Sequence, residues 1–268
     1  MEDSRKQYTR SDEKGMRIGA LIIARLNSTR LPGKNMMPIL GRPMIELMAE
    51  RVSAGRLIDK IIIATSNDAS DDPLEALANR LGTGCYRGSL ENVMERICGA
   101  VSAYDVDTVV ELLGDNPLVH CDLIHDCIRF FIDGRYDYAA TVTKEYPVPS
   151  AKFGLFSVGV RVQVYSREAA RGWASYPEYV KNSAKHPCAY IYEHPNRFNV
   201  GYFEARGKWE FMNKPDLTFA VNYRKNFDLV QRIFENNYPK DRNFSLRKVY
   251  EQLEQDRGLY DLMGRETF

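Results

Sequence analysis

The fold of this chain is decided by residues 18 to 34, which read Ile18-Gly-Ala-Leu-Ile-Ile-Ala-Arg-Leu-Asn-Ser-Thr-Arg-Leu-Pro-Gly-Lys34. The apolar run at the start has the length of a buried strand, and the polar loop after it carries Arg25, Arg30 and Lys34. In α/β proteins, a buried strand leading into a glycine-bearing basic loop ahead of a helix is typical of phosphate binding at the carboxyl edge of the sheet. Three cations so close together indicate a polyphosphate. The stretch therefore predicts a nucleotide site.

Strand and helix patterns alternate along the first half of the chain. Apolar or β-branched runs predict strands over residues 18–24, 60–65, 84–87, 108–112 and 136–143, and helical patterns lie between them at 44–54, 73–81, 90–103 and 121–133. Such alternation is typical of βαβ units and predicts an α/β fold with a mostly parallel sheet. Acidic residues and a proline at Asp71-Asp-Pro73 mark a helix start.

The pattern changes after about residue 144. Pro147 and Pro149 interrupt the chain, and residues 156–165 alternate like an antiparallel strand. Nearer the C-terminus the sequence predicts a strand over 219–221 and helices over 224–236 and 246–255. The change of pattern indicates either a substrate-facing lobe or an antiparallel extension of the main sheet.

These patterns predict one domain over residues 16–268 that carries a lobe at about 145–215. Residues 1–15 are polar and lack the apolar stretch of a signal peptide, so we expect a disordered tail there. The length of 268 residues is enough for a sizeable core.

The composition narrows the choice of partners. The chain has 37 Lys and Arg against 36 Asp and Glu, which gives a net charge of +1. Nucleic-acid binders usually carry a clear basic excess, so we expect no nucleic-acid partner. No apolar run approaches the roughly 20 residues of a membrane helix, so we expect no membrane partner either.

The five cysteines are odd in number and show no close pairing. Without an export signal they are expected to be reduced thiols of a cytoplasmic protein. His120, Cys121, His125 and Cys127 cluster in the sequence and suggest a metal site. Residues 118–131 have helical periodicity, however, and no second ligand pair completes a tetrahedral set, so a packed helix is favoured over zinc.

The opening motif extends into a signature that resembles a known family. Ala24-Arg-Leu-Asn-Ser-Thr-Arg-Leu-Pro-Gly-Lys34 and Gly41-Arg-Pro-Met44 match A-R-x-x-S-T-R-L-P-G-K and G-x-P-M at every fixed position. This signature belongs to the cytidylyltransferases that load acidic sugars such as 3-deoxy-manno-octulosonic acid and sialic acids onto CMP. The chain most resembles their spore-coat polysaccharide relatives. Further matches keep the family order at Ile63-Ala-Thr-Ser66, Asp71-Asp-Pro-Leu74, Arg87-Gly-Ser89, Arg96, Gly114-Asp-Asn-Pro-Leu118, Tyr190-Ile-Tyr-Glu193 and Phe227-Asp-Leu229.

The resemblance implies a fold and an activity. The fold would be a three-layer, Rossmann-like nucleotidyltransferase fold, with a mostly parallel sheet and a small antiparallel lobe through which the protein forms a homodimer. The activity would be Mg²⁺-dependent transfer of CMP from CTP to an acidic sugar or another anionic small molecule, with release of pyrophosphate.

Two other functions stay open. The phosphate loop does not read the base, so the chain could be a sugar-1-phosphate nucleotidyltransferase that uses another triphosphate. It could also be a nucleotide-binding partner subunit of weak or lost activity. A glycosyltransferase is disfavoured, because Gly114-Asp-Asn116 offers one carboxylate where an Asp-x-Asp metal motif is usual.

The donor half of the site is assigned to residues near the strand ends. Nucleotidyl transfer spreads charge over phosphoryl oxygens, so Arg25, Arg30 and Lys34 are expected to hold the triphosphate. Gly33 would let the backbone approach closely, beside Ser28 in the same loop. The residues expected to frame the base and ribose are Ala24, Thr65, Ser66, Arg87, Ser89 and Arg96, with an ordinary turn role as the alternative for each.

Asp115 directly follows the strand predicted over 108–112 and by resemblance is the family's metal-binding Asp. A carboxylate at this edge suits Mg²⁺, although it could instead cap the following turn. Relatives carry a second metal-binding Asp in a V-D-T-P-E-D-L stretch, and Asn222 stands in its place. An amide oxygen can ligate Mg²⁺ but lacks the charge that holds the ion.

A second departure concerns the acceptor. Relatives read roughly D-G-L-D-V-E-V-F where this chain has Val158-Gly-Val-Arg-Val-Gln-Val-Tyr165, so Arg161 and Gln163 replace two acidic positions. We therefore predict an anionic acceptor that meets Arg161, and Arg161→Ala should raise the KM of the acceptor far more than that of CTP. The predicted acceptor site comprises Asn116, Arg161, Gln163, Lys185 and His186, with a packing role as the alternative for His186.

Overall fold

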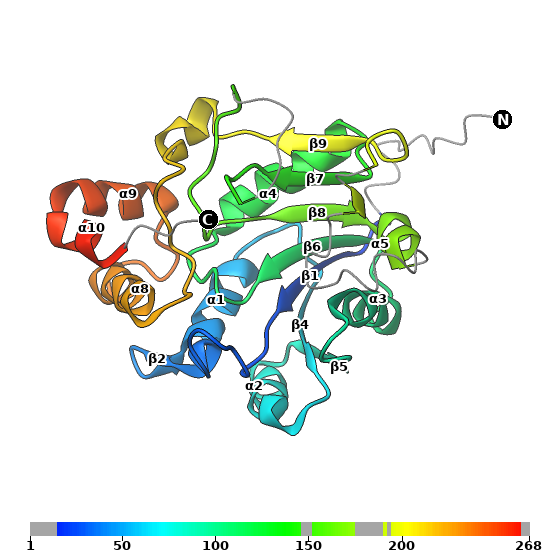
Figure 1. The fold of residues 1–268 in the computed structure, drawn as a ribbon, viewed down its shortest axis with the longest axis horizontal. Helices are drawn as coiled ribbons and strands as arrows, with labels where there is room; N and C mark the ends of the chain where they lie inside the picture. Colours follow the sequence, from blue (N-terminus) through cyan, green and yellow to red (C-terminus); the bar gives the residue numbers. More distant parts are fainter. Residues whose placement is uncertain (1–14, 146–151, 175–189, 192–193, 264–268) are drawn as a thin grey trace.

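A single seven-stranded sheet forms the centre of the computed structural model, which describes residues 15–145, 152–174, 190–191 and 194–263. The strands lie in the order β5-β4-β1-β6-β8-β7-β9 (Figure 1). Their bounds are β1 Ile18–Ile23, β4 Lys60–Ser66, β5 Gly84–Gly88, β6 Thr108–Leu113, β7 Tyr138–Thr141, β8 Gln163–Ser166 and β9 Val200–Phe203. A separate hairpin pairs β2 (Pro38–Ile39) with β3 (Arg42–Pro43).

Helices cover both faces of this sheet, which makes three layers. The bounds are α1 Met44–Ser53, α2 Asp72–Leu81, α3 Val93–Ala103, α4 Cys121–Asp133, α5 Arg167–Ala174, α8 Arg224–Asn237, α9 Leu246–Gln255 and α10 Arg257–Met263. One buried cluster joins the sheet to α3 and α5, and the other joins it to α1, α2, α4, α8 and α9. None of the described helices combines the length and the apolar character needed to cross a bilayer.

The predicted helices and strands of the first half are confirmed to within a few residues. The first parallel strands are buried on both faces, which explains why β1 and β6 are apolar runs rather than alternating patterns. Helix α2 has its proline in the first turn and ends at Gly82 in a left-handed conformation. Helix α3 begins at Val93 rather than near residue 90, because the Asn92 side chain caps it by accepting from the Glu95 amide.

The order of the strands places the site. β4 and β5 lie on one side of β1, and β6 lies on the other, all four parallel. The strand order therefore reverses at β1, and in open α/β sheets the ligand crevice lies outside the carboxyl ends of the strands at such a point. The Gly114 amide donates to the Ile23 carbonyl at 2.9 Å, which holds the two strand ends together. The predicted basic loop and the predicted metal-binding Asp thus leave the sheet side by side.

Two details of the second half differ from the prediction. Of the stretch 156–165 predicted as an antiparallel strand, only residues 163–165 are paired as such, in β8 between β6 and β7 inside the main sheet. The strand predicted over 219–221 is wrong. Gly159, at a φ of +93°, lies so close to this segment that a Cβ there would be 2.2 Å from the Ala220 nitrogen. The two segments are joined by an isolated bridge between Val158 and Thr218 and not by a β-ladder.

The predicted lobe at about 145–215 includes residues 146–151 and 175–189, which lie outside the described residues, as do Pro147, Pro149, Lys185, His186 and Cys188. The disordered tail predicted over residues 1–15 falls there too, apart from Gly15. The division into a domain and a lobe stays a prediction. Cys85, Cys98, Cys121 and Cys127 are free thiols, and burial raises the pKa of Cys85 and of Cys98 to about 11.

Candidate nucleotide-binding site

The loop after β1 is a compact turn that exposes two of its three cations. The Ser28 and Gly33 amides both donate to the Leu26 carbonyl at 2.9 Å, and Gly33 adopts a left-handed φ of 71°. Arg25 and Arg30 are exposed, whereas Ala24 is buried at the strand end. The turn therefore presents arginines to solvent at the crevice, as a site for an anion requires.

A buried carboxylate that the sequence reasoning missed holds this loop in place. Asp71 is 1% exposed and accepts from the Leu26 amide at 2.6 Å and from the Ser66 amide at 3.2 Å. The Ser66 hydroxyl donates to the same carboxylate. Asp71 thus ties the loop after β1 to the end of β4. In the sequence Asp71 stands as one of two acids at a helix start and within a family match, and neither observation predicts its bonds to Leu26 and Ser66.

Lys34 and Asp115 meet where the strand order reverses. The Lys34 ammonium donates to Asp115 Oδ2 at 2.7 Å and to the Val221 carbonyl at 2.8 Å. The Val221 amide in turn donates to the Asp115 carbonyl at 2.8 Å. Lys34 is 6% exposed, so it lies beneath the loop and not on its surface. Three segments far apart in the sequence are joined here, and Asn222 follows directly.

Arg96 lies on α3 and faces the same region as Arg25. It is 2% exposed and donates through Nη1 to the Ser89 carbonyl at 3.0 Å. Its Nε has no hydrogen-bond partner among the described residues. Burial lowers the pKa of Arg96, and repulsion from the Arg25 cation lowers it further. Two like charges this close, one buried with a donor left over, favour an anion between them.

The polar side chains at the ends of β4 and β5 divide into two groups. Thr65 is fully buried, and its hydroxyl has no partner within the part of the chain that the structure describes. Ser89 accepts from the Asn92 amide at 3.0 Å and so helps to start α3. Thr65 is thus left with a donor that a ligand could use, while Ser66 and Ser89 bond within the protein.

Arg87 is engaged by four hydrogen bonds within the protein. It donates to the Ser66 and Asp68 carbonyls at 3.0 and 2.7 Å, and its Nη1 lies 2.8 Å from Glu75 and 2.6 Å from Asp72. Hydrogen bonds to Glu75 and Asp72 raise the pKa of Arg87. The side chain therefore holds β5 to the connection between β4 and α2. Its predicted contact with the nucleotide stays a prediction.

Two of the predicted acceptor residues are buried, Gln163 in β8 and Arg161 two residues before it. Arg161 is 2% exposed and donates to the Tyr138 hydroxyl and to Gln163 Oε1, both at 3.2 Å. Gln163 is fully buried and donates through Nε2 to Glu111 at 3.0 Å. Tyr165 donates to the other Glu111 oxygen at 2.8 Å. The two residues that replace acids of the relatives are therefore part of a network with a buried acid on β6.

Glu111 is the second residue that the sequence reasoning missed. It is a lone charge in the apolar strand Thr108–Leu113, and its register partner on β8 is Gln163. A charged residue in the middle of a strand that is buried on both faces needs a partner. The position of Glu111 in an apolar run could therefore have indicated a buried polar network. The negative charge that seemed removed from this region is thus present on the neighbouring strand.

The remaining acceptor and metal candidates lie near the same edge. Asn116 is 3% exposed and its amide donates to the Leu113 carbonyl at 2.9 Å, in the turn that carries Asp115. Asn222 is 6% exposed and its amide donates to the Ala220 carbonyl. Asp115 and Asn222 are therefore brought together by the Val221 contacts, as their predicted shared role requires.

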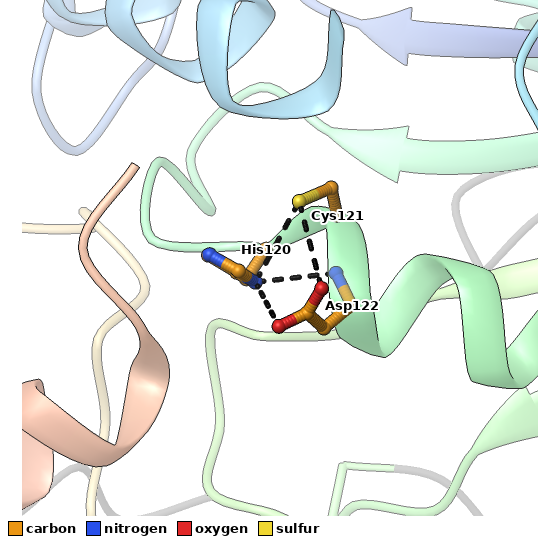
Figure 2. A group of neighbouring side chains, drawn as sticks. All are labelled: His120, Cys121 and Asp122. Atoms are coloured by element: carbon orange, nitrogen blue, oxygen red, sulfur yellow. Dashed lines mark hydrogen bonds and ion pairs between the residues drawn. The ribbon is translucent and has the colours of Figure 1, made fainter. Parts of the chain in front are cut away.

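A separate cluster of potential metal ligands lies at the start of α4 (Figure 2). His120, Cys121 and Asp122 offer ligand atoms within 4.8 Å of one another. His120 Nδ1 accepts from the Asp122 amide at 3.1 Å, so Nε2 carries the proton and donates to the Asn243 carbonyl. Burial lowers the pKa of His120, and the nearby Arg51 cation lowers it further. Both ring nitrogens are used and a cation is close, which is the arrangement of a helix cap.

A sequence profile described as cytidylyltransferase matches residues 19–264. The chain belongs to the cytidylyltransferase family. As a member of this family it is a nucleotidyltransferase, and the resemblance seen in the basic loop is confirmed.

Relatives of this cytidylyltransferase agree with the assignment. Spore coat polysaccharide biosynthesis protein SpsF of Bacillus subtilis is 26% identical over 219 residues, which cover 80% of this chain and 85% of that protein. A 3-deoxy-manno-octulosonate cytidylyltransferase of Bdellovibrio bacteriovorus is 30% identical over 60% of this chain and 64% of its own length. The structure of a cytidylyltransferase from Leptospira borgpetersenii superposes with a TM-score of 0.81 at 19% identity, covering 94% and 99% of the two chains. The predicted Rossmann-like nucleotidyltransferase fold is thereby confirmed.

Proposed function

We propose that this cytidylyltransferase is a Mg²⁺-dependent enzyme that transfers CMP from CTP to an anionic small-molecule acceptor and releases pyrophosphate. One observation carries the proposal: a loop with two exposed arginines bonds through Lys34 to a carboxylate at the point where the strand order reverses. Arg25 and Arg30 offer exposed positive charge, and Lys34 of the same loop bonds to Asp115. A polyphosphate and its metal ion are the ligands that this combination of charges suits.

The residues fit a magnesium site with a single protein carboxylate. Asp115 Oδ2 accepts from Lys34, while Oδ1 has no hydrogen-bond partner among the described residues and the side chain is 21% exposed. Mg²⁺ typically takes one or two carboxylates and completes its shell with phosphate oxygens and water. Asp115 and the amide oxygen of Asn222 would hold the ion, which when bound neutralises charge on the phosphate oxygens.

The side chains of this crevice would act by position and charge. An acceptor oxygen attacks the α-phosphorus, the bond to the bridging oxygen breaks, and pyrophosphate leaves with the electron pair. Arg25 and Arg30 would bind the β- and γ-phosphates, so that charge developing on the leaving group is already compensated. Arg96 would donate its remaining N–H to the nucleotide from the α3 side. Asp71 would keep the loop from shifting during the reaction.

The anionic nature of the acceptor rests on the relatives and on local charge. The names of the relatives refer to a polysaccharide and to 3-deoxy-manno-octulosonate, an acidic sugar. Arg161 is buried in the network around Gln163, so we propose that it acts on the acceptor only if that network opens. A homodimer and a cytoplasmic location are also proposed, with light scattering and cell fractionation as their tests.

The test is pyrophosphate release with each of the four nucleoside triphosphates, Mg²⁺ and a panel of carboxylated and phosphorylated sugars. Turnover with CTP alone supports the proposal. Turnover with another triphosphate would instead identify a nucleotidyltransferase of different base preference. CTP binding without turnover on the whole panel would favour a partner subunit. An Arg30→Ala variant serves as the matched loss of the triphosphate contact.

A further inference from the structure

Lys34 makes contacts within the protein that it would have to give up in order to bind a triphosphate. Its ammonium lies 2.7 Å from Asp115 Oδ2 and 2.8 Å from the Val221 carbonyl, and the side chain is 8% exposed. Arg25 and Arg30, in the same loop, are exposed. The buried lysine therefore serves the carboxylate of the crevice, while the arginines remain available to phosphate.

This arrangement neutralises the carboxylate that a divalent ion needs. An ammonium at hydrogen-bond distance cancels the charge of Asp115, and a dication placed on Oδ1 would be repelled by the same ammonium. Within the described ranges Asp115 belongs to no group of three or more His, Cys, Asp or Glu side chains that could hold a metal ion; the one such group found there is His120, Cys121 and Asp122. Asn222 supplies no charge. In the free protein Lys34 therefore balances the charge of Asp115, and the exposed arginines of the same loop add positive charge.

We infer that Lys34 denies divalent metal ions a competent site in the free protein, so that the ion enters only together with the triphosphate. The negative charge of the nucleotide replaces the charge that Lys34 has cancelled, and Asp115 then contributes one oxygen through Oδ1. Lys34 is thus a positioning residue, which acts on the metal through Asp115. The second half of this inference rests on the proposed function, whereas the first half concerns the free protein alone.

The test is a titration of the nucleotide-free protein with Mn²⁺, followed by the electron paramagnetic resonance signal of the unbound ion. The wild type is expected to bind Mn²⁺ only in the millimolar range. Lys34→Met removes the competing charge and should tighten Mn²⁺ binding at least about tenfold, the scale of removing a unit charge next to the site. Lys34→Arg keeps the charge and should leave the weak binding unchanged.

Matched variants separate this effect from general charge and from misfolding. Lys225→Met removes one charge from an exposed side chain three residues after Asn222, and should not change Mn²⁺ affinity more than twofold. Lys34→Gln keeps a donor for the Val221 carbonyl and should show the same gain as Lys34→Met. Adding Asp115→Asn to Lys34→Met should abolish the gain, with melting curves recorded for every variant.

Two results would overturn the inference. One is micromolar Mn²⁺ binding by the nucleotide-free wild type. The other is folded Lys34→Met and Lys34→Gln proteins that bind Mn²⁺ no better than the wild type. A repeat of the titration with CTP tests the second half, because tight Mn²⁺ binding should then appear in the wild type. Failure to bind any triphosphate would refute the proposed function but leave the result on the free protein intact.

Discussion

The loop after β1 and the network between strands β6 and β8 both contain charged side chains, which are exposed in the loop and buried in the network. Arg25 and Arg30 are exposed in the loop after β1. Arg161 and Glu111 are buried and joined through Gln163 and two tyrosines. Exposure thus separates the charges that we propose to bind a ligand from those that bond within the protein.

The same contrast recurs between two arginines that the sequence assigned to one role. The Arg87 guanidinium donates to Asp72, Glu75 and two carbonyls, and the hydrogen bonds to Glu75 and Asp72 raise its pKa. Arg96 keeps a buried donor without a partner among the described residues, and its pKa is lowered by burial and by Arg25. A cation that the fold disfavours is a stronger candidate for ligand binding than one that the fold satisfies.

The largest effect on activity is expected at Asp115, at the end of β6. Asp115→Asn removes the carboxylate charge and should lower kcat/KM for pyrophosphate release about a thousandfold, because a metal-bound transition state loses its one protein carboxylate. Asp216→Asn, at an exposed carboxylate, is the control and should stay within about twofold. An Asp115→Asn protein that is folded and within tenfold of wild-type activity would contradict the assignment of this edge.

Substitutions in the buried network around Glu111 are expected to change the stability of the protein. Glu111→Gln removes one charge from a buried network and should lower the free energy of unfolding by about 3 kcal/mol in urea denaturation, since the remaining groups lose their compensation. Adding Arg161→Met should recover part of this loss. If Arg161→Met alone raised the KM of the acceptor without any loss of stability, Arg161 would belong with the open charges.

The paired arginines sharpen the comparison further. Arg96→Met should raise the KM of CTP about tenfold, the value of one charge-assisted hydrogen bond, with little change in melting temperature. Arg87→Met should leave the KM nearly unchanged and lower stability by about 1 kcal/mol, because its partners are partly exposed carboxylates. Steady-state kinetics and thermal melts of both proteins check this, and the reverse outcome would exchange their roles.

The smallest effect is expected at the helix cap of α4. The pKa of His120 is lowered in the folded protein, so its stabilising neutral form is fully present above the ordinary value of about 6.5 and is lost as the pH falls towards the folded pKa. His120→Asn keeps a capping oxygen and removes the titration. Its unfolding free energy should therefore depend less on pH between pH 7 and 5 than that of the wild type. An equal slope for both proteins would show that His120 is not the group responsible.

The sequence by itself determined the fold class of this protein and the position of its basic loop after β1. Strand and helix periodicity and the turn chemistry of residues 18–34 are properties of contiguous residues, so the parallel sheet and the basic loop after β1 could be predicted without the structure.

Only the tertiary structure decided what the charged side chains do. Lys34 bonds to residues 81 and 187 positions away, and Glu111 bonds to residues 52 and 54 positions away. Asp71 likewise reaches Leu26 on another loop. Partners so distant are set by packing, and packing also sets burial, which determines whether a charge must be satisfied inside the protein or remains available for a ligand.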